Sequence, residues 1–278
     1  MNTISRRHFL GSVAAGLPLT AYALRSFSAE GAEFILGSQS YSFRNFDTEN
    51  ALDQLQQLGL SYMEFCAVHF PPDPANPKLE EIKALIAAKG ITVPAYGVEG
   101  FSADAEANRK KFEFAKAMGI AILTADPSPD SFDNLDALTQ EFSIAIAIHN
   151  HGPGARYDKV DDTLRAVAGR NPLIGACLDT GHCIRSGEKP HEVIKQLGGR
   201  LICMHLKDWV HGGAEQIVGK GDLDVNATVK ALKDINFAGP IMLEYEESPD
   251  NPVPDMKQGV ANWKDAVKHA NGAEATTT

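Results

Sequence analysis

The chain has 278 residues, with 36 acidic and 26 basic side chains and a formal net charge of −10. No cluster of lysines and arginines could follow a phosphate backbone, so nucleic acid is not an expected partner. Without its first 30 or so residues, the chain has the usual length of one (β/α)8 barrel, about 250 residues. We therefore predict a single domain.

The first residues have the pattern of a twin-arginine export signal. Ser5-Arg6-Arg7-His8-Phe9-Leu10 precedes a weakly apolar run, Gly11 to Ala23, that is too short to span a bilayer. Cleavage is expected after Ala23 or near Ser28, and we assign residues 1–30 to the signal. We predict a periplasmic protein that uses the twin-arginine export machinery and has no stable membrane association.

From Phe34 onward, apolar runs alternate with stretches of helical period, which predicts an α/β fold of parallel βα units. Helices are expected over 50–58, 79–89 and 103–118, each followed by a glycine that suits a helix C-cap. A proline-rich stretch, 71–77, predicts a long loop, and 272–278 a disordered tail. The expected fold is a (β/α)8 TIM barrel over 31–271. Its eight predicted strands are Ile35–Ser42, Tyr62–Cys66, Thr92–Val98, Ile120–Ala125, Ser143–His149, Ile174–Asp179, Leu201–Lys207 and Ile241–Tyr245.

Each of the last four predicted strands carries a metal-binding side chain at or near its end. His149 lies in AIAIHNHG, Asp179 in GACLDTGH, His205 in ICMHLKD and Glu244 in IMLEYEE. The carboxyl ends of the strands carry the chemistry of such barrels, and nitrogen and oxygen ligands from several strands suit a divalent ion. A lone histidine at a strand end is more often a hydrogen-bonded structural residue. Four candidates on four successive strands instead predict a metal-dependent enzyme.

Other polar residues near the same strand ends are candidates for substrate chemistry. Lys207 shares a strand face with His205, and His182 follows Asp179 by three residues. We predict that both orient substrate or move protons; the alternatives are a solvent-facing lysine and a hydrogen-bonded loop histidine. The predicted substrate contacts are Glu64, His69, His151 and Trp209. The alternatives are that Glu64 only caps the loop after its strand and that Trp209 only packs against its own loop.

Two further features have simple interpretations. The four cysteines, Cys66, Cys177, Cys183 and Cys203, include no CxxC pair and are expected to be small buried hydrophobes. An oxidising compartment permits a disulfide without requiring one. The segment Gly219-Lys220-Gly221-Asp222 lacks the pattern of a nucleotide-binding P-loop.

The motifs resemble those of the xylose-isomerase-like barrel superfamily, the sugar phosphate isomerase/epimerase group that also includes inosose dehydratases, ketose 3-epimerases and endonuclease IV. The similarity runs from QSYSF and YMEF through HNHG to LEYE, and its most specific motifs are LDTGH and HLKD. It implies one divalent ion, Mn²⁺, Mg²⁺, Co²⁺ or Zn²⁺, held by His149, Asp179, His205 and Glu244. Ketose epimerases of the group usually have a glutamate at the position of His149. In those enzymes this glutamate and the last-strand glutamate act as a pair of bases. His151 could replace His149 as ligand, but strand alternation places it beyond the strand end.

The resemblance implies a sugar isomerase or epimerase that acts on a keto-sugar or related polyol. A divalent ion bound to a carbonyl acidifies the neighbouring C–H and stabilises an enediolate, so Glu244 suffices as base. The alternative is a lyase or hydratase of a 3-keto-glycoside, and the presence of His149 in place of a glutamate favours this alternative. Export favours an unphosphorylated substrate. A non-catalytic exported sugar-binding protein conflicts with the intact ligand set. An endonuclease IV-type enzyme would require further zinc ligands and a basic groove.

Overall fold

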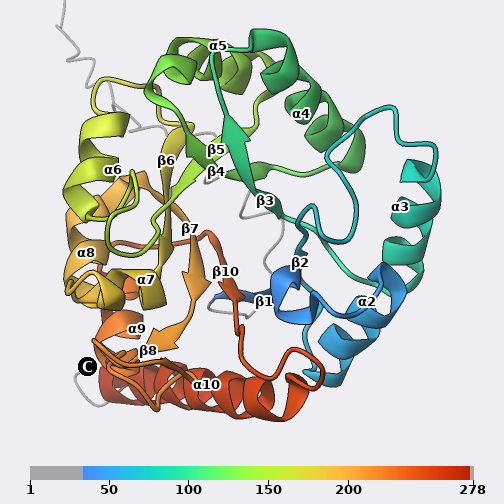
Figure 1. The fold of residues 1–278 in the computed structure, drawn as a ribbon. Coiled ribbons are helices and arrows are strands. Elements are labelled where there is room, and N and C mark those ends of the chain that lie inside the picture. Colours follow the sequence, from blue (N-terminus) through green and yellow to red (C-terminus); the bar gives the residue numbers. More distant parts are fainter. Residues whose placement is uncertain (1–33, 276–278) are drawn as a thin grey trace, which may run out of the picture.

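The alternation of apolar runs and amphipathic segments produces parallel strands joined by helices, which confirms the predicted barrel (Figure 1). The computed structural model describes residues 34–275. Eight parallel strands follow the order β2-β1-β10-β7-β6-β5-β4-β3. Bridges from Tyr62 to Thr92 and from Phe65 to Tyr96 join the two ends of this sheet. The strands are β1 (Ile35–Gln39), β2 (Met63–Glu64), β3 (Ala95–Phe101), β4 (Ile122–Pro127), β5 (Ala145–His149), β6 (Ile174–Asp179), β7 (Leu201–Leu206) and β10 (Pro240–Leu243).

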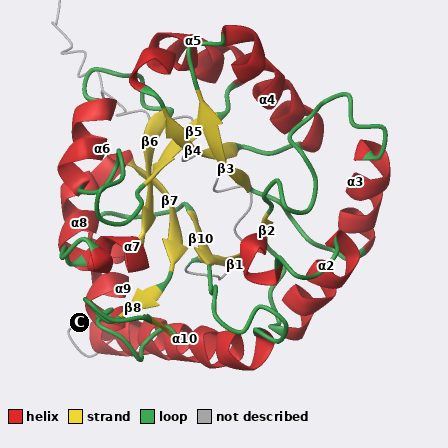
Figure 2. Cartoon of the chain, in the orientation of Figure 1, coloured by secondary structure: helices red, strands yellow, loops and turns green. Residues whose placement is uncertain are grey.

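Helices surround the barrel on its outside, as Figure 2 shows. A short antiparallel pair, β8 (Asp208–Trp209) and β9 (Glu215–Gln216), was not predicted and follows β7 directly. Short 3₁₀ helices lie at Ser40–Phe43, Pro129–Ser131 and Gly198–Arg200. The α-helices are α2 (Thr48–Gln57), α3 (Leu79–Ala88), α4 (Ala105–Met118), α5 (Phe132–Phe142), α6 (Val160–Val167), α7 (Thr180–Arg185), α8 (Pro190–Leu197), α9 (Val225–Asp234) and α10 (Val253–Ala275).

The barrel interior below the carboxyl ends of the strands is filled by small side chains. Ala145 and Ala147 share the inward face of β5 with His149, because side chains two apart on a strand point the same way. Cys177 and Cys203 lie at paired positions on β6 and β7, one layer below Asp179 and His205. All four cysteines are buried and unpaired, as expected for small hydrophobes.

Two expectations about the ends of the chain have different outcomes. Helix α10 continues to Ala275, so residues 272–275 are helical where we predicted a disordered tail. Alanine and glutamate are good helix formers, which suits this extension. The predicted signal, residues 1–30, lies outside the described residues. No described helix combines the length and the hydropathy that a transmembrane segment requires.

Candidate metal centre

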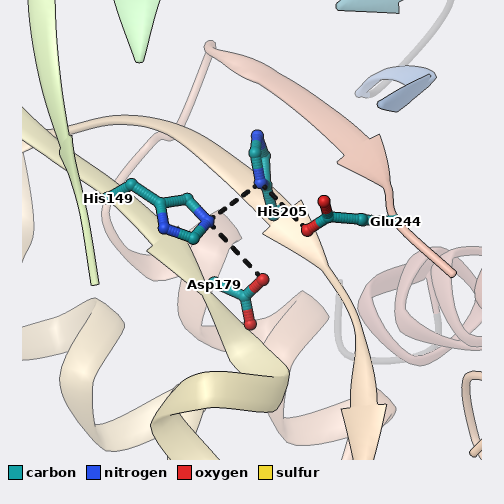
Figure 3. A group of neighbouring side chains, drawn as sticks. All are labelled: His149, Asp179, His205 and Glu244. Atoms are coloured by element: carbon teal, nitrogen blue, oxygen red, sulfur yellow. Dashed lines mark hydrogen bonds and ion pairs between the residues drawn. The ribbon is translucent and has the colours of Figure 1, made fainter. Parts of the chain in front are cut away.

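The four predicted ligands converge at the carboxyl end of the barrel (Figure 3). His149 and Asp179 are the last residues of β5 and β6, His205 lies near the end of β7, and Glu244 follows β10. One nitrogen or oxygen atom from each lies within 4.8 Å of the others. All four side chains are buried, and Glu244 is the most accessible at 8%. The sequence therefore brings two imidazoles and two carboxylates from four strands to one point.

Strand register accounts for this convergence. Asp179 pairs with His205 across β6 and β7, while His149 pairs with Cys177. The backbone N–H of Glu244 donates to the carbonyl of Leu206 at 3.1 Å, which extends β10 by one residue beside β7. Asp179 and His205 thus lie at the same height in the barrel, while the stagger of the strands pairs His149 one layer lower and sets Glu244 two residues beyond Met242, the partner of His205.

The distances between donor atoms are those expected around one ion. His149 Nε2 lies 3.1 Å from His205 Nδ1 and 3.6 Å from Asp179 Oδ2. His205 Nδ1 lies 3.4 Å from Glu244 Oε2. Metal–ligand bonds of about 2.1 Å place neighbouring ligand atoms roughly 3.0 Å apart in an octahedron and roughly 3.4 Å apart in a tetrahedron. The cluster therefore needs little rearrangement to hold a divalent ion.

Two further observations support this fit. Asp179 Oδ2 is buried and has no hydrogen-bond partner, although Oδ1 accepts the backbone N–H of His182 at 2.7 Å. A buried carboxylate oxygen without a partner is costly, and a cation at the centre of the cluster would remove that cost. His205 Nε2 lies 3.0 Å from Glu64 Oε2, so an N–H there is held by the carboxylate and Nδ1 is the ring atom directed at the cluster.

Glu64 therefore has a different role from the predicted one. Its side chain is fully buried, and its other oxygen accepts the hydroxyl of Thr124. Because β2 directs this side chain into the barrel, Glu64 orients His205 and does not border the cavity. This position gives the predicted substrate contact at Glu64 no support.

His69 also lies away from the cavity. A turn after β2, in which the His69 N–H donates to the Cys66 carbonyl, directs the ring against Phe65 at a centroid distance of 5.7 Å. Neither ring nitrogen has a hydrogen-bond partner. Burial lowers the pKa of His69, as expected for a neutral packed ring. His69 is not among the cavity-lining residues, so the structure gives this predicted contact no support either.

A cavity of about 620 Å³ opens above the cluster, a size in the range of small-molecule sites. His149 and Glu244 lie on its wall. The other predicted contacts that line it are His151, His182 and Trp209. Sequence reasoning missed Arg185 and Glu215, which also line it; neither belongs to a ligand-like motif, and each enters through the path of its loop or short helix.

Lys207 lies behind the ligands and is 1% exposed. Its Nζ is 3.1 Å from Glu244 Oε2 and 3.8 Å from Asp179 Oδ2, and it also pairs with Glu246. It does not line the cavity, so the structure places it as the charge partner of two ligands and not as a residue that meets substrate.

The buried charges are unequal, since carboxylates outnumber the single lysine. Burial tends to raise the pKa of Glu244, but Lys207 and His205 hold it below its ordinary value. Burial also tends to lower the pKa of His205, but Glu64 and Glu244 raise it well above the ordinary value. The centre of the cluster thus attracts positive charge, as the site of a divalent cation must.

Two other groups on the cavity wall have shifted pKa values. Burial raises the pKa of Glu215 to about 8, so this carboxyl is largely protonated at neutral pH. Burial lowers the pKa of His182 to about 4, despite the nearby carboxylate of Asp179. The cavity therefore offers a neutral carboxyl and a neutral imidazole beside the ionised ligands.

Residues 52–269 match a protein family described as xylose isomerase-like TIM barrel. An inosose dehydratase of Clostridium botulinum is 30% identical over 145 residues, which cover 45% of this chain and 48% of that protein. A 3-oxo-isoapionate decarboxylase of Pectobacterium atrosepticum is 40% identical over 62 residues, 22% of each chain. The matched part thus spans about half the length, or less, of these curated relatives.

Solved structures show the same fold over most of the chain. An uncharacterised protein from Parabacteroides distasonis has a TM-score of 0.66 and 30% identity, with 83% of this chain and 98% of that one covered. L-ribulose 3-epimerase has a TM-score of 0.70 at 15% identity, with 87% and 97% covered, and shows the fold alone. The extent of the family match and the agreement in fold lead to one conclusion: the chain belongs to the xylose isomerase-like TIM barrel family.

Proposed function

We propose that this protein is a divalent-metal-dependent enzyme that removes a proton from the carbon beside a carbonyl in a keto-sugar or related polyol. The observation that carries the proposal is the buried cluster of two imidazoles and two carboxylates, one of which, Glu244, also borders the cavity. When bound, a divalent ion supplies the Lewis acidity that makes such a C–H bond acidic enough for a carboxylate base. Mn²⁺, Mg²⁺, Co²⁺ and Zn²⁺ all suit this donor set.

Glu244 is the proposed base. Its Oε2 is held by Lys207 Nζ at 3.1 Å and by His205 Nδ1 at 3.4 Å. Neither of these contacts involves Oε1, which leaves that oxygen to take a proton from substrate. Lys207 acts through the carboxylates of Glu244 and Asp179, by keeping both ionised in a buried place. His182, His151 and Trp209 face the substrate from the cavity wall.

Elimination of a substituent from the next carbon is the outcome we propose for the resulting carbanion. Epimerisation needs a second base on the opposite side of the substrate, and this chain has His149 where a carboxylate would serve that purpose. The inosose dehydratases to which it is similar are, by name, enzymes that remove water. A lyase or dehydratase therefore agrees with both the donor set and the relatives.

Isomerisation or epimerisation is the second candidate, and His151 is the observation that favours it. Its ring lines the cavity 4.7 Å from the ring of His149, on the β5 side and not the β10 side that carries Glu244. An imidazole there could exchange a proton with the face of the substrate that Glu244 does not reach.

Deuterium incorporation tests the shared step and separates the outcomes. Metal-loaded protein is incubated in D₂O with a panel of keto-sugars, keto-polyols and 3-keto-glycosides, and products are followed by NMR. We expect deuterium at one carbon of an epimer or isomer, or an unsaturated product if elimination prevails. Glu244→Gln should slow this reaction by about 10²-fold or more, the usual scale for a positioned base.

The matched control is Glu247→Gln, which removes an exposed carboxylate of the same cavity wall that has no contact with the cluster. Metal content is measured on each variant, so that loss of the base is separated from loss of the ion. Turnover of a substrate by hydrolysis or hydride shift, with no solvent deuterium in any carbon, would refute the proposal. Binding of sugar without turnover would instead identify a sugar-binding protein.

A further inference from the structure

Arg185, the last residue of α7, connects three parts of the cavity wall. Its Nη1 lies 2.8 Å from Nδ1 of His182, one turn earlier in the same helix. Its guanidinium carbon lies 4.9 Å from the centre of the Trp209 ring, which follows β7. Both Arg185 and His182 line the cavity.

A glycine from a third strand end provides the space for this guanidinium. A Cβ added at Gly152 would lie 2.8 Å from Arg185 Cζ and 3.1 Å from Nε, closer than packed atoms approach. Gly152 is the last residue of the His-Asn-His-Gly motif after β5. The motif glycine, the aromatic ring and the imidazole therefore hold Arg185 in one place from three sides.

The chemistry of the two side chains settles the direction of the hydrogen bond between them. A guanidinium carries only donors, so Arg185 donates and His182 Nδ1 accepts. A neutral imidazole whose Nδ1 accepts has its proton on Nε2. No other hydrogen bond to this ring is present among the described residues, so Nε2–H is the donor that remains for a ligand.

We propose that Arg185 is a positioning residue that fixes His182 as the Nε2–H tautomer, which donates a hydrogen bond to a carbonyl or hydroxyl oxygen of the substrate. The inference rests on the proposed function for the identity of that substrate, but the tautomer itself is a property of the protein alone. It replaces the proton-moving role predicted for His182 with that of a neutral donor. An Nδ1 occupied by Arg185 cannot pass a proton onward, because the guanidinium stays charged.

The tautomer is measured directly by two-bond ¹H–¹⁵N NMR correlation on zinc-loaded, ¹⁵N-histidine-labelled protein. The His182 signals are identified by their loss in His182→Gln. We expect Nδ1 to show the chemical shift of an unprotonated acceptor and Nε2 that of an N–H. Arg185→Met should populate the Nδ1–H form, and Arg185→Lys, which restores a donor, should recover much of the original pattern.

Arg156→Met is the matched control, since it removes an exposed guanidinium that pairs with Asp126 and not with His182. A wild-type protein with protonated Nδ1 would overturn the proposal. An Nε2–H tautomer that is unchanged in Arg185→Met would do the same, because His182 would then not depend on Arg185.

Kinetics on whichever substrate exchanges deuterium provide the second readout. A glutamine side-chain N–H occupies nearly the place of Nε2–H, so His182→Gln should retain at least about tenfold more kcat/KM than His182→Ala, as expected for one hydrogen bond to substrate. Equal losses in the two variants would contradict the donor role. If no substrate exchanges deuterium and none yields an unsaturated product, the proposed function fails, while the NMR result still decides the tautomer.

Discussion

At the scale of single residues, the site depends on glycines as much as on ligands. Gly181, between Asp179 and His182 in the sequence, leaves the path for Lys207, because an added Cβ would lie 2.5 Å from Lys207 Cγ. Lys207 needs that path to reach Glu244 and Asp179. The LDTGH motif therefore contains a candidate ligand, a gap for its charge partner and a proposed substrate contact in succession.

Gly181→Ala should destabilise the protein although alanine is the better helix former. Helix propensity favours alanine by about 1 kcal/mol, whereas overpacking a filled site costs about 1–3 kcal/mol. We expect a net fall in Tm, with about 2–4 °C for each kcal/mol lost, and weaker metal binding as Lys207 shifts. The control is Gly199→Ala, where the added Cβ meets nothing. Equal Tm values for the two variants would show that Lys207 accommodates the methyl group.

Sequence reasoning found the metal cluster because each ligand ends an apolar run, and that signal is local. It did not foresee the positions of Glu64 and His69, because these depend on which side chains meet across the barrel. Glu64 lies 141 residues from His205 in the sequence, and no local pattern predicts their contact at 3.0 Å. Arg185 was missed for the same reason, since its neighbours Gly152 and Trp209 come from other strand ends.

At the scale of elements, a single buried carboxylate organises the segment after β7. Asp208 accepts backbone N–H groups from Trp209 and Gly219 at 2.8 Å, and from Gly221 and Leu223 at 2.9 Å. Gly221 is required beside it, because an added Cβ would lie 2.4 Å from Asp208 Oδ1. The anchored segment carries Trp209 and Glu215 to the cavity, so Asp208 shapes the site without lining it.

Asp208→Asn should loosen this segment, because an amide NH₂ group would face backbone donors that now find an acceptor. Hydrogen bonds to a charged group are worth about 1.5–3 kcal/mol each, so the loss of even one is measurable. We expect faster limited proteolysis between 210 and 222, detected by mass spectrometry, together with lower substrate affinity. Asp234→Asn, at an exposed salt bridge with Lys230, is the control. Identical cleavage rates would contradict the anchoring role of Asp208.

The elements themselves were largely predictable, and their departures have local causes. The strand predicted over Ile35–Ser42 ends at Gln39, whose side chain accepts the N–H of Tyr41 and begins a 3₁₀ turn. Glycines with positive φ follow α2, α3 and α4, as the C-cap pattern indicated. The β8–β9 pair was missed because each strand has only two residues, too few to show a period in the sequence.

At the scale of the whole molecule, the candidate ion would link four strands that are neighbours in the barrel. A ligand that binds only the folded state stabilises it by about 2.7 kcal/mol at a concentration 100 times its Kd. We therefore expect Mn²⁺ or Zn²⁺ to raise the Tm of chelator-treated protein by roughly 5–10 °C. Asp179→Asn, which keeps an oxygen to cap α7, should largely abolish this shift, while Glu247→Gln should not. A Tm independent of metal would refute the site.

Export is a property of the full chain, and we propose that the twin-arginine pathway places this protein in the periplasm. Replacement of Arg6 and Arg7 by lysine should leave folded precursor in the cytoplasm, as measured by fractionation and immunoblotting. A variant with an unaltered signal and Glu244→Gln controls for loss of function. Normal periplasmic levels of the double-lysine variant would contradict the proposal.

The barrel is joined unevenly around its circumference, and this has a consequence for how such proteins diversify. The strands that carry the cluster pair over three or four residues each, with one register shift between β6 and β7, whereas β2 has two residues and reaches β3 through isolated bridges. The sparse side supplies Gln39, Tyr41, Ala67 and Val68 to the cavity wall. Gln39 is tied by hydrogen bonds to the Gly97 carbonyl and the Tyr41 N–H, but none of the four residues belongs to the candidate ligand cluster. Mutations on this side can therefore change substrate specificity while the candidate metal centre stays intact. We expect related proteins to share the type of reaction more often than they share the substrate.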